Sequence, residues 1–297
     1  MRNLHERKLG KAAARGLCAR RLRKSRAEDG HGGNAAAFQF HGIGKGDLKP
    51  SMQAMNAALM DTIATCGDVN RNVMASSNPI ESPAHSEVAD WARRLSEHLL
   101  PKTRAYYEIW LNGEKLEGTP EHEPVYGTNF LPRKFKAAIA LPPSNDVDIY
   151  TQDLGFIAIV EDGRLVGFNL TVGGGLGTTH GDATTHPRLA NVAGFLAPEH
   201  LLAVAEAVVT TQRDYGDRTN RNKARLKYVL DAWGFEKFLA AVEEKLGRKL
   251  ARVDAAHVAP RPAIDRLAHI GVRAQKQPGL NYIGVWTPLG KMTVAQM

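Results

Sequence analysis

Two kinds of segment alternate along this chain. Some are strand-like runs followed by a residue pair that favours a tight turn, and others have apolar residues at the spacing of one helix face. Asp162-Gly163 separates the runs 156–160 and 165–172, and Asn112-Gly113 follows a third run at 106–111. A two-residue loop joins antiparallel neighbours, whereas a parallel pair needs a long crossover. The sequence therefore predicts an α+β fold, with helices packed on antiparallel sheets. Further strands are expected at 133–141 and 281–286, and helices at 50–65, 83–100, 198–213, 221–232 and 235–246.

Positive charge is concentrated at the start of the chain. Residues 1–30 hold ten Lys or Arg and three acidic residues, whereas the other 267 hold 29 basic and 28 acidic residues. Such a block is typical of a solvated arm, and nucleic-acid binding or an Arg-rich targeting role are the alternatives. The block lacks the apolar stretch of a secretory signal, and the apolar run at 201–209 is too short to span a membrane. We expect a cytoplasmic protein with a nearly neutral folded part.

Cysteine is scarce, with only Cys18 and Cys66 in the chain. Two thiols cannot build a disulfide framework, a four-cysteine zinc site or the four thiolates of an iron–sulfur cluster. This usage indicates a reducing compartment, which agrees with the cytoplasmic expectation.

Two short segments are candidate anion sites. In the strand expected at 133–141, Lys134 and Lys136 lie on one face, and Arg133 lies on the other. Upstream, Arg71 stands between two asparagines in what reads as a polar loop between helices, and its planar guanidinium suits an oxyanion. A solvated strand end and an Asx-type turn are the simpler interpretations of the two segments.

Other polar segments give weaker signals. The glycine-rich run 172–177 does not fit a dinucleotide-binding motif. Its glycines either allow the backbone to approach a flat ligand closely or form a plain flexible loop. His180, Asp182 and His186 are a candidate zinc site, but their spacing matches no standard zinc motif. The Arg-rich segment 210–221 could form a second basic wall together with Lys223, Arg225 and Lys227 just downstream.

Six motifs are decisive when they are taken together and in order. They are Phe-Gln-Phe-His-Gly-Ile (38–43), Asp-Val-Asn-Arg-Asn-Val (68–73), Ser-Asn-Pro (77–79), Leu-Pro-Arg-Lys-Phe-Lys (131–136), Val-Gly-Gly-Gly-Leu (172–176) and Val-Val-Thr-Thr-Gln-Arg-Asp (208–214). In this order they resemble the sirohaem-containing sulfite and nitrite reductases, and most strongly the hemoprotein subunits of NADPH-dependent sulfite reductases. The resemblance covers about residues 38–297 but only about the first half of the family's length.

The resemblance implies a fold, cofactors and site residues. It implies roughly half of a pseudo-symmetric fold, with a disordered or non-homologous tail at 1–37, a ferredoxin-like half-domain at 38–145, an α+β domain at 146–262 and the start of a second repeat at 263–297. The implied cofactors are sirohaem and a 4Fe-4S cluster, and the implied reaction is six-electron reduction of sulfite to sulfide. Substrate-facing roles fall on Arg71, Lys134 and Lys136, and sirohaem-binding roles on Gln39, His41, Asn72, Arg133, Gly174, Gly175 and Arg225.

The chain also departs from the family pattern. Residues 31–37 lack the Arg that the family carries there, and the family's four cluster cysteines lie in its second half. We therefore expect an incomplete hemoprotein that by itself neither binds the cluster nor reduces sulfite. The implied partners are a flavoprotein that supplies electrons from NADPH and a polypeptide with the missing C-terminal half. The alternatives are a nitrite reductase of the same family and a non-catalytic, basic-tailed protein that binds anions or nucleic acid.

Overall fold

The computed structural model describes residues 43–57, 67–76, 78–103, 110–111, 114–115, 123–252, 270–275 and 277–286. The chain forms two compact units. The larger unit comprises Ile63–Ala263 with Gly32–Ala37, and the other comprises Met1–His31, Phe38–Thr62 and Ile264–Met297. The candidate cations of the sequence analysis and the glycine-rich run all lie in the larger unit.

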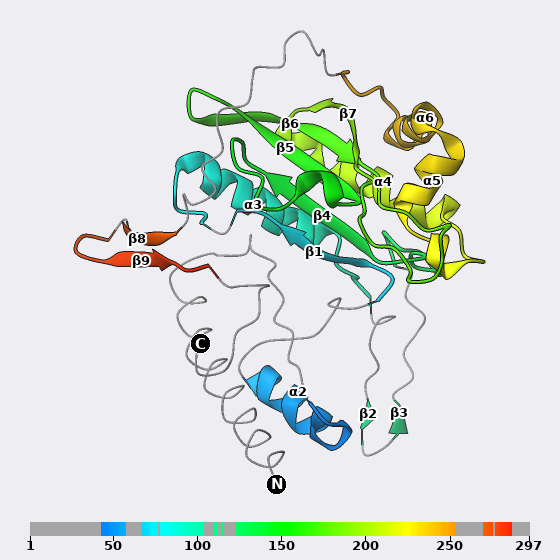
Figure 1. Ribbon diagram of the computed structural model, residues 1–297, viewed down its shortest axis with the longest axis horizontal. Helices are drawn as coiled ribbons and strands as arrows, with labels where there is room; N and C mark the ends of the chain where they lie inside the picture. The colour runs from blue at the N-terminus through cyan, green and yellow to red at the C-terminus, as the bar shows by residue number, and fades with distance from the viewer. Residues whose placement is uncertain are drawn as a thin grey trace. The chain divides into compact units, whose positions relative to one another are not determined.

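One five-stranded sheet organises the larger unit (Figure 1). Its strands are β1 (Asn70–Met74), β4 (Phe135–Ala140), β5 (Leu154–Glu161), β6 (Arg164–Val172) and β7 (Asn191–Leu196), and they lie in the order β1-β4-β5-β6-β7. β1, β4 and β5 pair in parallel, whereas β5, β6 and β7 pair in antiparallel fashion. The α+β class is confirmed, and the sheet is mixed rather than wholly antiparallel.

The parallel pairs follow from the connections. The tight turn at Asp162-Gly163, where both residues have positive φ, joins β5 to β6 as the sequence predicts. By contrast, the path from β1 to β4 runs through the helix α3 (Pro83–His98), and the path from β4 to β5 runs through residues 141–153. These long connections allow a crossover, so the next strand can run in the same direction.

Four helices cover one face of the sheet: α3, α4 (Leu201–Tyr215), α5 (Leu226–Trp233) and α6 (Phe235–Leu246). Ser82 caps the start of α3 by accepting a hydrogen bond from His85 N, and Pro83 follows at the first helical position. Gly247 ends α6 in the left-handed conformation. The helical stripes share one buried core with Phe156 and Phe168 of the sheet.

The opposite face of the sheet carries a much smaller apolar cluster. Ala138 and Ala140 of β4 pack there with Val147 and Ile149, the latter in the short helix η3 (Ile149–Thr151). Since side chains alternate along a strand, Lys136 lies on the same face as Ala138. The fold therefore places Lys136 away from the helices.

Several elements differ from the expected ones. The segment expected as a polar loop around Arg71 is strand β1, because Val69 and Val73 are buried beside β4. β7 was not expected at all. Strands β4 and β5 lie on either side of the proposed boundary at 145/146 and belong to one sheet; the proposed domain limits stay a prediction.

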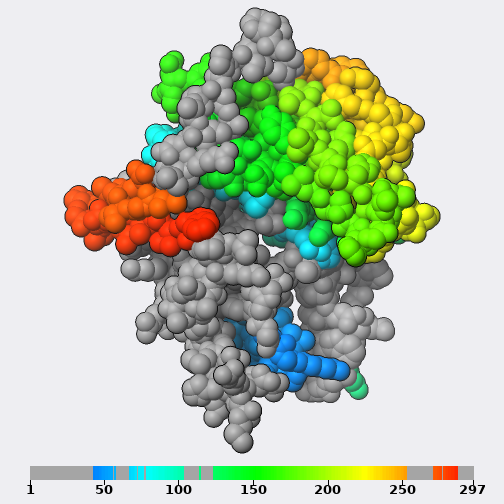
Figure 2. Space-filling view, viewed as in Figure 1, coloured from blue at the N-terminus to red at the C-terminus, as the bar shows by residue number. Residues whose placement is uncertain are grey.

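The remaining described elements are short. The smaller unit contains η1 (Lys45–Asp47), α2 (Leu48–Ala57) and the hairpin of β8 (Gly271–Ala274) and β9 (Asn281–Gly284), which is red in Figure 2. The larger unit also contains the pair β2 (Trp110–Leu111) and β3 (Glu114–Lys115), η4 (Pro198–His200) and η5 (Arg221–Lys223). No helix in the described ranges is long and apolar enough to cross a membrane.

Candidate anion site at the β1–β4 edge

Three basic side chains gather where β1 and β4 begin, and we call Arg71, Lys134 and Lys136 the cation cluster. The parallel register sets Asn70 opposite Phe135, so the first residues of both strands are neighbours. Lys134 directly precedes β4, and its pKa is lowered by burial and by the nearby charges of Arg71 and Lys136. The structure thus brings together the three substrate-facing residues that the sequence indicated.

In the part of the chain that the structure describes, the side chains of the cation cluster have no directly bonded counter-charge. Arg71 Nε donates to Gly67 O at 3.3 Å, and no carboxylate of the described ranges forms a hydrogen bond or ion pair with the side chains of Arg71, Lys134 or Lys136. Like charges held together without a counter-charge raise the free energy of the folded state. Such an arrangement is stabilised by an external anion, which makes this edge a candidate anion site.

Asp153, which the sequence analysis missed, lies directly behind the cation cluster. Its side chain is fully buried, and its Oδ2 accepts from Lys136 N at 3.1 Å and from Arg225 Nη2 at 2.7 Å. Burial raises the pKa of Asp153, while the Arg225 guanidinium opposes that rise. Nothing in the local sequence marks Asp153, because Arg225 lies far along the chain.

The glycine-rich run packs against this buried ion pair. A Cβ on Gly175 would lie 3.0–3.2 Å from three atoms of the Arg225 guanidinium, and one on Gly174 would lie 2.3 Å from Tyr150 O. Gly174 N also donates to Gln152 O at 2.9 Å. These two glycines are therefore required by contacts within the protein. Their predicted contact with a cofactor stays a prediction.

Lys227 fastens the loop that follows the glycines. It is buried on α5, and its Nζ donates to Gly175 O at 3.1 Å, to Gly177 O at 2.8 Å and to His186 O. Burial lowers the pKa of Lys227. The sequence placed this lysine in a basic wall, whereas its ammonium group faces three backbone carbonyls.

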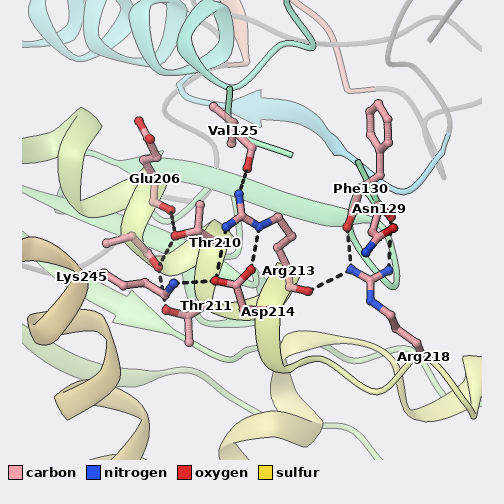
Figure 3. Close-up of polar contacts among 11 residues, drawn as sticks. Val125, Asn129, Phe130, Glu206, Thr210, Thr211, Arg213, Asp214, Arg218 and Lys245 are labelled. Carbon is pink, nitrogen blue, oxygen red and sulfur yellow. Dashed lines mark hydrogen bonds and ion pairs between the residues drawn. The ribbon is translucent and has the colours of Figure 1, made fainter. Parts of the chain in front are cut away.

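The arginines of 210–221 are likewise occupied by acceptors of the protein. Arg213 Nη1 donates to Val125 O at 2.7 Å, and Arg218 Nη2 donates to Phe130 O at 2.7 Å (Figure 3). Arg221 forms a two-point pair with Asp68 at 2.9 and 3.0 Å. The expected second basic wall is therefore wrong for these three arginines, because their guanidinium groups hold neighbouring segments in place.

Other predicted site residues have mixed outcomes. Gln39 and His41 lie outside the described residues, and Asn72 contributes its backbone to β1. Arg133 precedes β4, and burial together with Arg221 lowers its pKa. Arg225, expected near sirohaem, is bound to Asp153 and has a side chain only 13% exposed.

The candidate zinc residues do not converge. His186 Nε2 lies 2.9 Å from Asp231 Oδ2, whereas Asp182 accepts from Thr184 and Asn222. Within the part of the chain that the structure describes, no group of three or more His, Cys, Asp or Glu could hold a metal ion.

Comparison with known proteins identifies the family of the chain. The profile of the family described as nitrite and sulphite reductase 4Fe-4S domain matches residues 90–250, which is more than half of the chain. The chain therefore belongs to the nitrite and sulphite reductase family, and the resemblance of the six motifs is confirmed.

Individual members of the family are similar to large parts of the chain. The sulfite reductase (NADPH) hemoprotein beta-component of Myxococcus xanthus is 62% identical over 211 residues, which cover 71% of this chain and 37% of that protein. Its counterpart in Bacillus subtilis is 56% identical over 222 residues, covering 74% and 39%. The solved structure of Mycobacterium tuberculosis NirA matches with a TM-score of 0.55 and 28% identity, over 79% of this chain and 37% of that one. The chain spans about two fifths of the length of these curated relatives.

The two cofactors of the family fit these residues differently. A 4Fe-4S cluster needs four thiolates, but the 297 residues contain only Cys18 and Cys66, so they cannot supply its ligands alone. Sirohaem carries many carboxylates, and cations without carboxylate partners suit such a group. The cation cluster and Arg133, whose guanidinium forms no hydrogen bond with a carboxylate among the described residues, fit it on chemical grounds.

Proposed function

We propose that this chain is the part of a sulfite reductase hemoprotein that supplies the substrate-facing cations. The observation that carries the proposal is the cation cluster, where Arg71, Lys134 and Lys136 share one edge and none of their side chains bonds to a carboxylate of the described residues. The relatives at 55–62% identity are named sulfite reductases, which favours sulfite as the oxyanion.

The chemistry of sulfite reduction suits these groups. Sulfite loses its three oxygens as water while the sulfur takes up six electrons, and sirohaem, when bound, would pass on electrons that a separate donor supplies. Arg71 holds an oxyanion through its planar donors. Lys134 and Lys136 stabilise negative charge on the oxygens, and an ammonium with a lowered pKa, such as that of Lys134, releases a proton more readily.

The complete reaction needs partners. The four cluster thiolates require a second polypeptide or segment, and a flavoprotein is the proposed source of electrons from NADPH, as the relatives' name implies. We expect the chain on its own to bind oxyanions without reducing sulfite. The cysteine usage favours a cytoplasmic location.

Sulfite titration into the full chain tests the proposal. Isothermal titration at low ionic strength should show sulfite binding that is weakened about tenfold by Arg71→Gln, Lys134→Gln or Lys136→Gln, since each variant loses one charge-assisted contact. Arg164→Gln is the matched control, because Arg164 is an exposed cation on β6. Equal sulfite affinity in all four variants, or no binding to the unaltered chain, would contradict the proposal.

Nitrite is the second candidate substrate, because the matched family is described for both anions. A parallel titration with nitrite separates the two. A doubly charged anion gains more from three clustered cations than a singly charged one, so sulfite should bind more tightly. Tighter binding of nitrite would favour the nitrite reductase alternative.

A further inference from the structure

Asp153 lies at the meeting point of segments that the sequence marked separately. Its Oδ2 accepts from the backbone N of Lys136 on β4 and from Arg225 at the start of α5, at 3.1 and 2.7 Å. Its backbone oxygen accepts from Gly173 N at 2.9 Å, and Arg225 in turn lies against Gly175. One buried carboxylate thus joins the cation cluster to the glycine-rich run.

We propose that Asp153 is a positioning residue for the anion site: it fixes the start of β4 and the Arg225 guanidinium, and thereby sets where Lys134 and Lys136 meet an oxyanion. The inference rests on the proposed function. It assigns Asp153 a role through Lys136 and Arg225 rather than through contact with the anion.

A positioning role and a purely electrostatic role predict opposite changes of anion affinity in Asp153→Asn. A carboxylate next to clustered cations lowers the local positive potential, so electrostatics alone predict that Asp153→Asn strengthens anion binding. Positioning predicts the opposite, because the neutral amide leaves Arg225 without its ionic partner in a buried place. The direction of the change therefore separates the two roles.

The pH dependence of anion binding to the unaltered chain is a second test. Burial raises the pKa of Asp153, so its protonation, and with it the loss of the ion pair, falls at higher pH than for an ordinary Asp. The charged groups that face Asp153 are Arg225 and Lys227 from the α5 side and Lys136 from β4. Positioning therefore predicts that anion binding weakens as the pH falls through that raised pKa.

Glu243 provides a matched control. It is a buried carboxylate on α6 that accepts from one ammonium, Lys249 Nζ at 2.8 Å, and from one backbone amide, Leu250 N at 3.1 Å. Glu243→Gln therefore removes the same kind of interaction without touching the cation cluster.

Amide hydrogen exchange measures the positioning directly. In Asp153→Asn, the amides of Lys136 and Gly173 should exchange at least tenfold faster than in the unaltered chain. Lys136 N donates to the altered side chain, and Gly173 N donates to the backbone oxygen of the same residue, which loses its ionic tie to Arg225. Glu243→Gln should leave both amides unchanged. Unchanged exchange in Asp153→Asn would overturn the inference.

Titration with inorganic sulfate, which stays doubly ionised in mild acid, completes the test. Sulfate should bind Asp153→Asn about tenfold more weakly than the unaltered chain at neutral pH. The unaltered chain and Glu243→Gln should lose sulfate affinity as the pH falls, whereas the affinity of Asp153→Asn should not depend on pH in this range. Equal or tighter sulfate binding by Asp153→Asn overturns the inference. A sulfate affinity of the unaltered chain that does not change in acid also overturns it, and this measurement can be made even if the variant does not fold. If the unaltered chain binds neither sulfate nor sulfite, the proposed function fails and the inference fails with it.

Discussion

Basic residues in two regions of the larger unit have opposite environments. On α4 and the turn that follows it, Arg213 and Arg218 donate to the backbone oxygens of Val125, Asn129 and Phe130, and so tie the segment 123–131 to the helix (Figure 3). At the β1–β4 edge, the side chains of Lys134 and Lys136 have no such acceptors among the described residues, and charge repulsion adds to the cost of burying Lys134. Basic residues of the first kind stabilise the fold, whereas those of the second kind carry a cost that an external anion would offset.

The largest effect is expected where a guanidinium is satisfied and partly buried. Arg213→Met removes the donor to Val125 O and the partner of Asp214, so the free energy of unfolding should fall by about 2–3 kcal/mol. Urea denaturation of the full chain measures the change. A loss below the error of the method would mean that these contacts do not distinguish the two regions.

A smaller loss is expected at Lys227. Lys227→Met removes the ammonium donor to the oxygens of Gly175, Gly177 and His186. Gly175 O still accepts from Arg188 N at 3.0 Å, and Gly177 and His186 are exposed and can bond to water instead. We expect a loss of about 1–2 kcal/mol in urea denaturation. Faster amide exchange confined to residues 175–186 should accompany it, and a change of exchange throughout the sheet would contradict this local role.

The cation cluster should respond in the opposite direction. The folded state lowers the pKa of Lys134 below its ordinary 10.5, so the unfolded chain holds this proton more tightly and the charged lysine destabilises the fold at neutral pH. Lys134→Met should therefore stabilise the anion-free protein, by less than about 1 kcal/mol because solvent screens a partly exposed group.

The pH dependence of that gain follows from the same shift. The gain is full below the lowered pKa of Lys134, shrinks as the folded protein loses that proton, and is gone above about 10.5, where the unfolded chain has lost it as well. Thermal unfolding of both proteins at several pH values measures it. Destabilisation by Lys134→Met at neutral pH would show that the lysine belongs with the satisfied basic residues.

The smallest effect is expected for an exposed ion pair. Arg93 of α3 contacts Asp90 and Glu97 on the helix surface, so Arg93→Met should leave the melting temperature unchanged within error. A clear drop would show that ion pairing itself, rather than the partly buried bonds to backbone oxygens, distinguishes Arg213 from the cation cluster.

Local signals predicted most of the helices and the β5–β6 hairpin. Residues 235–246 read as a helix and form α6, since their apolar stripe and the following Gly247 act within a few turns. β1 was missed because Asn70 and Arg71 hide its strand character, and its burial depends on distant β4. The parallel pairing of β4 with β5 has no local signal, because the residues between them only permit a crossover.

For the candidate site, too, the residues with a local signal were predicted and those that depend on distant partners were not. Lys134 and Lys136 were found because they stand in one short motif, and Arg71 was found beside them only through the family resemblance. Asp153 and the true role of Lys227 were missed, because both depend on partners that meet only in the folded chain. The pairing of Arg225 with Asp153 could not be inferred for the same reason.

The short bridge between Phe195 of β7 and Ala251 has a consequence for the behaviour of the whole sheet. Phe195 N donates to Ala251 O at 2.7 Å, and Gly194 lies so close that a Cβ there would sit 2.6 Å from the same oxygen. This contact occupies one position on the edge strand β7, whose free backbone groups would otherwise be open to a strand from another molecule. Ala251, just after α6, thus reduces the part of this edge that is available for edge-to-edge aggregation.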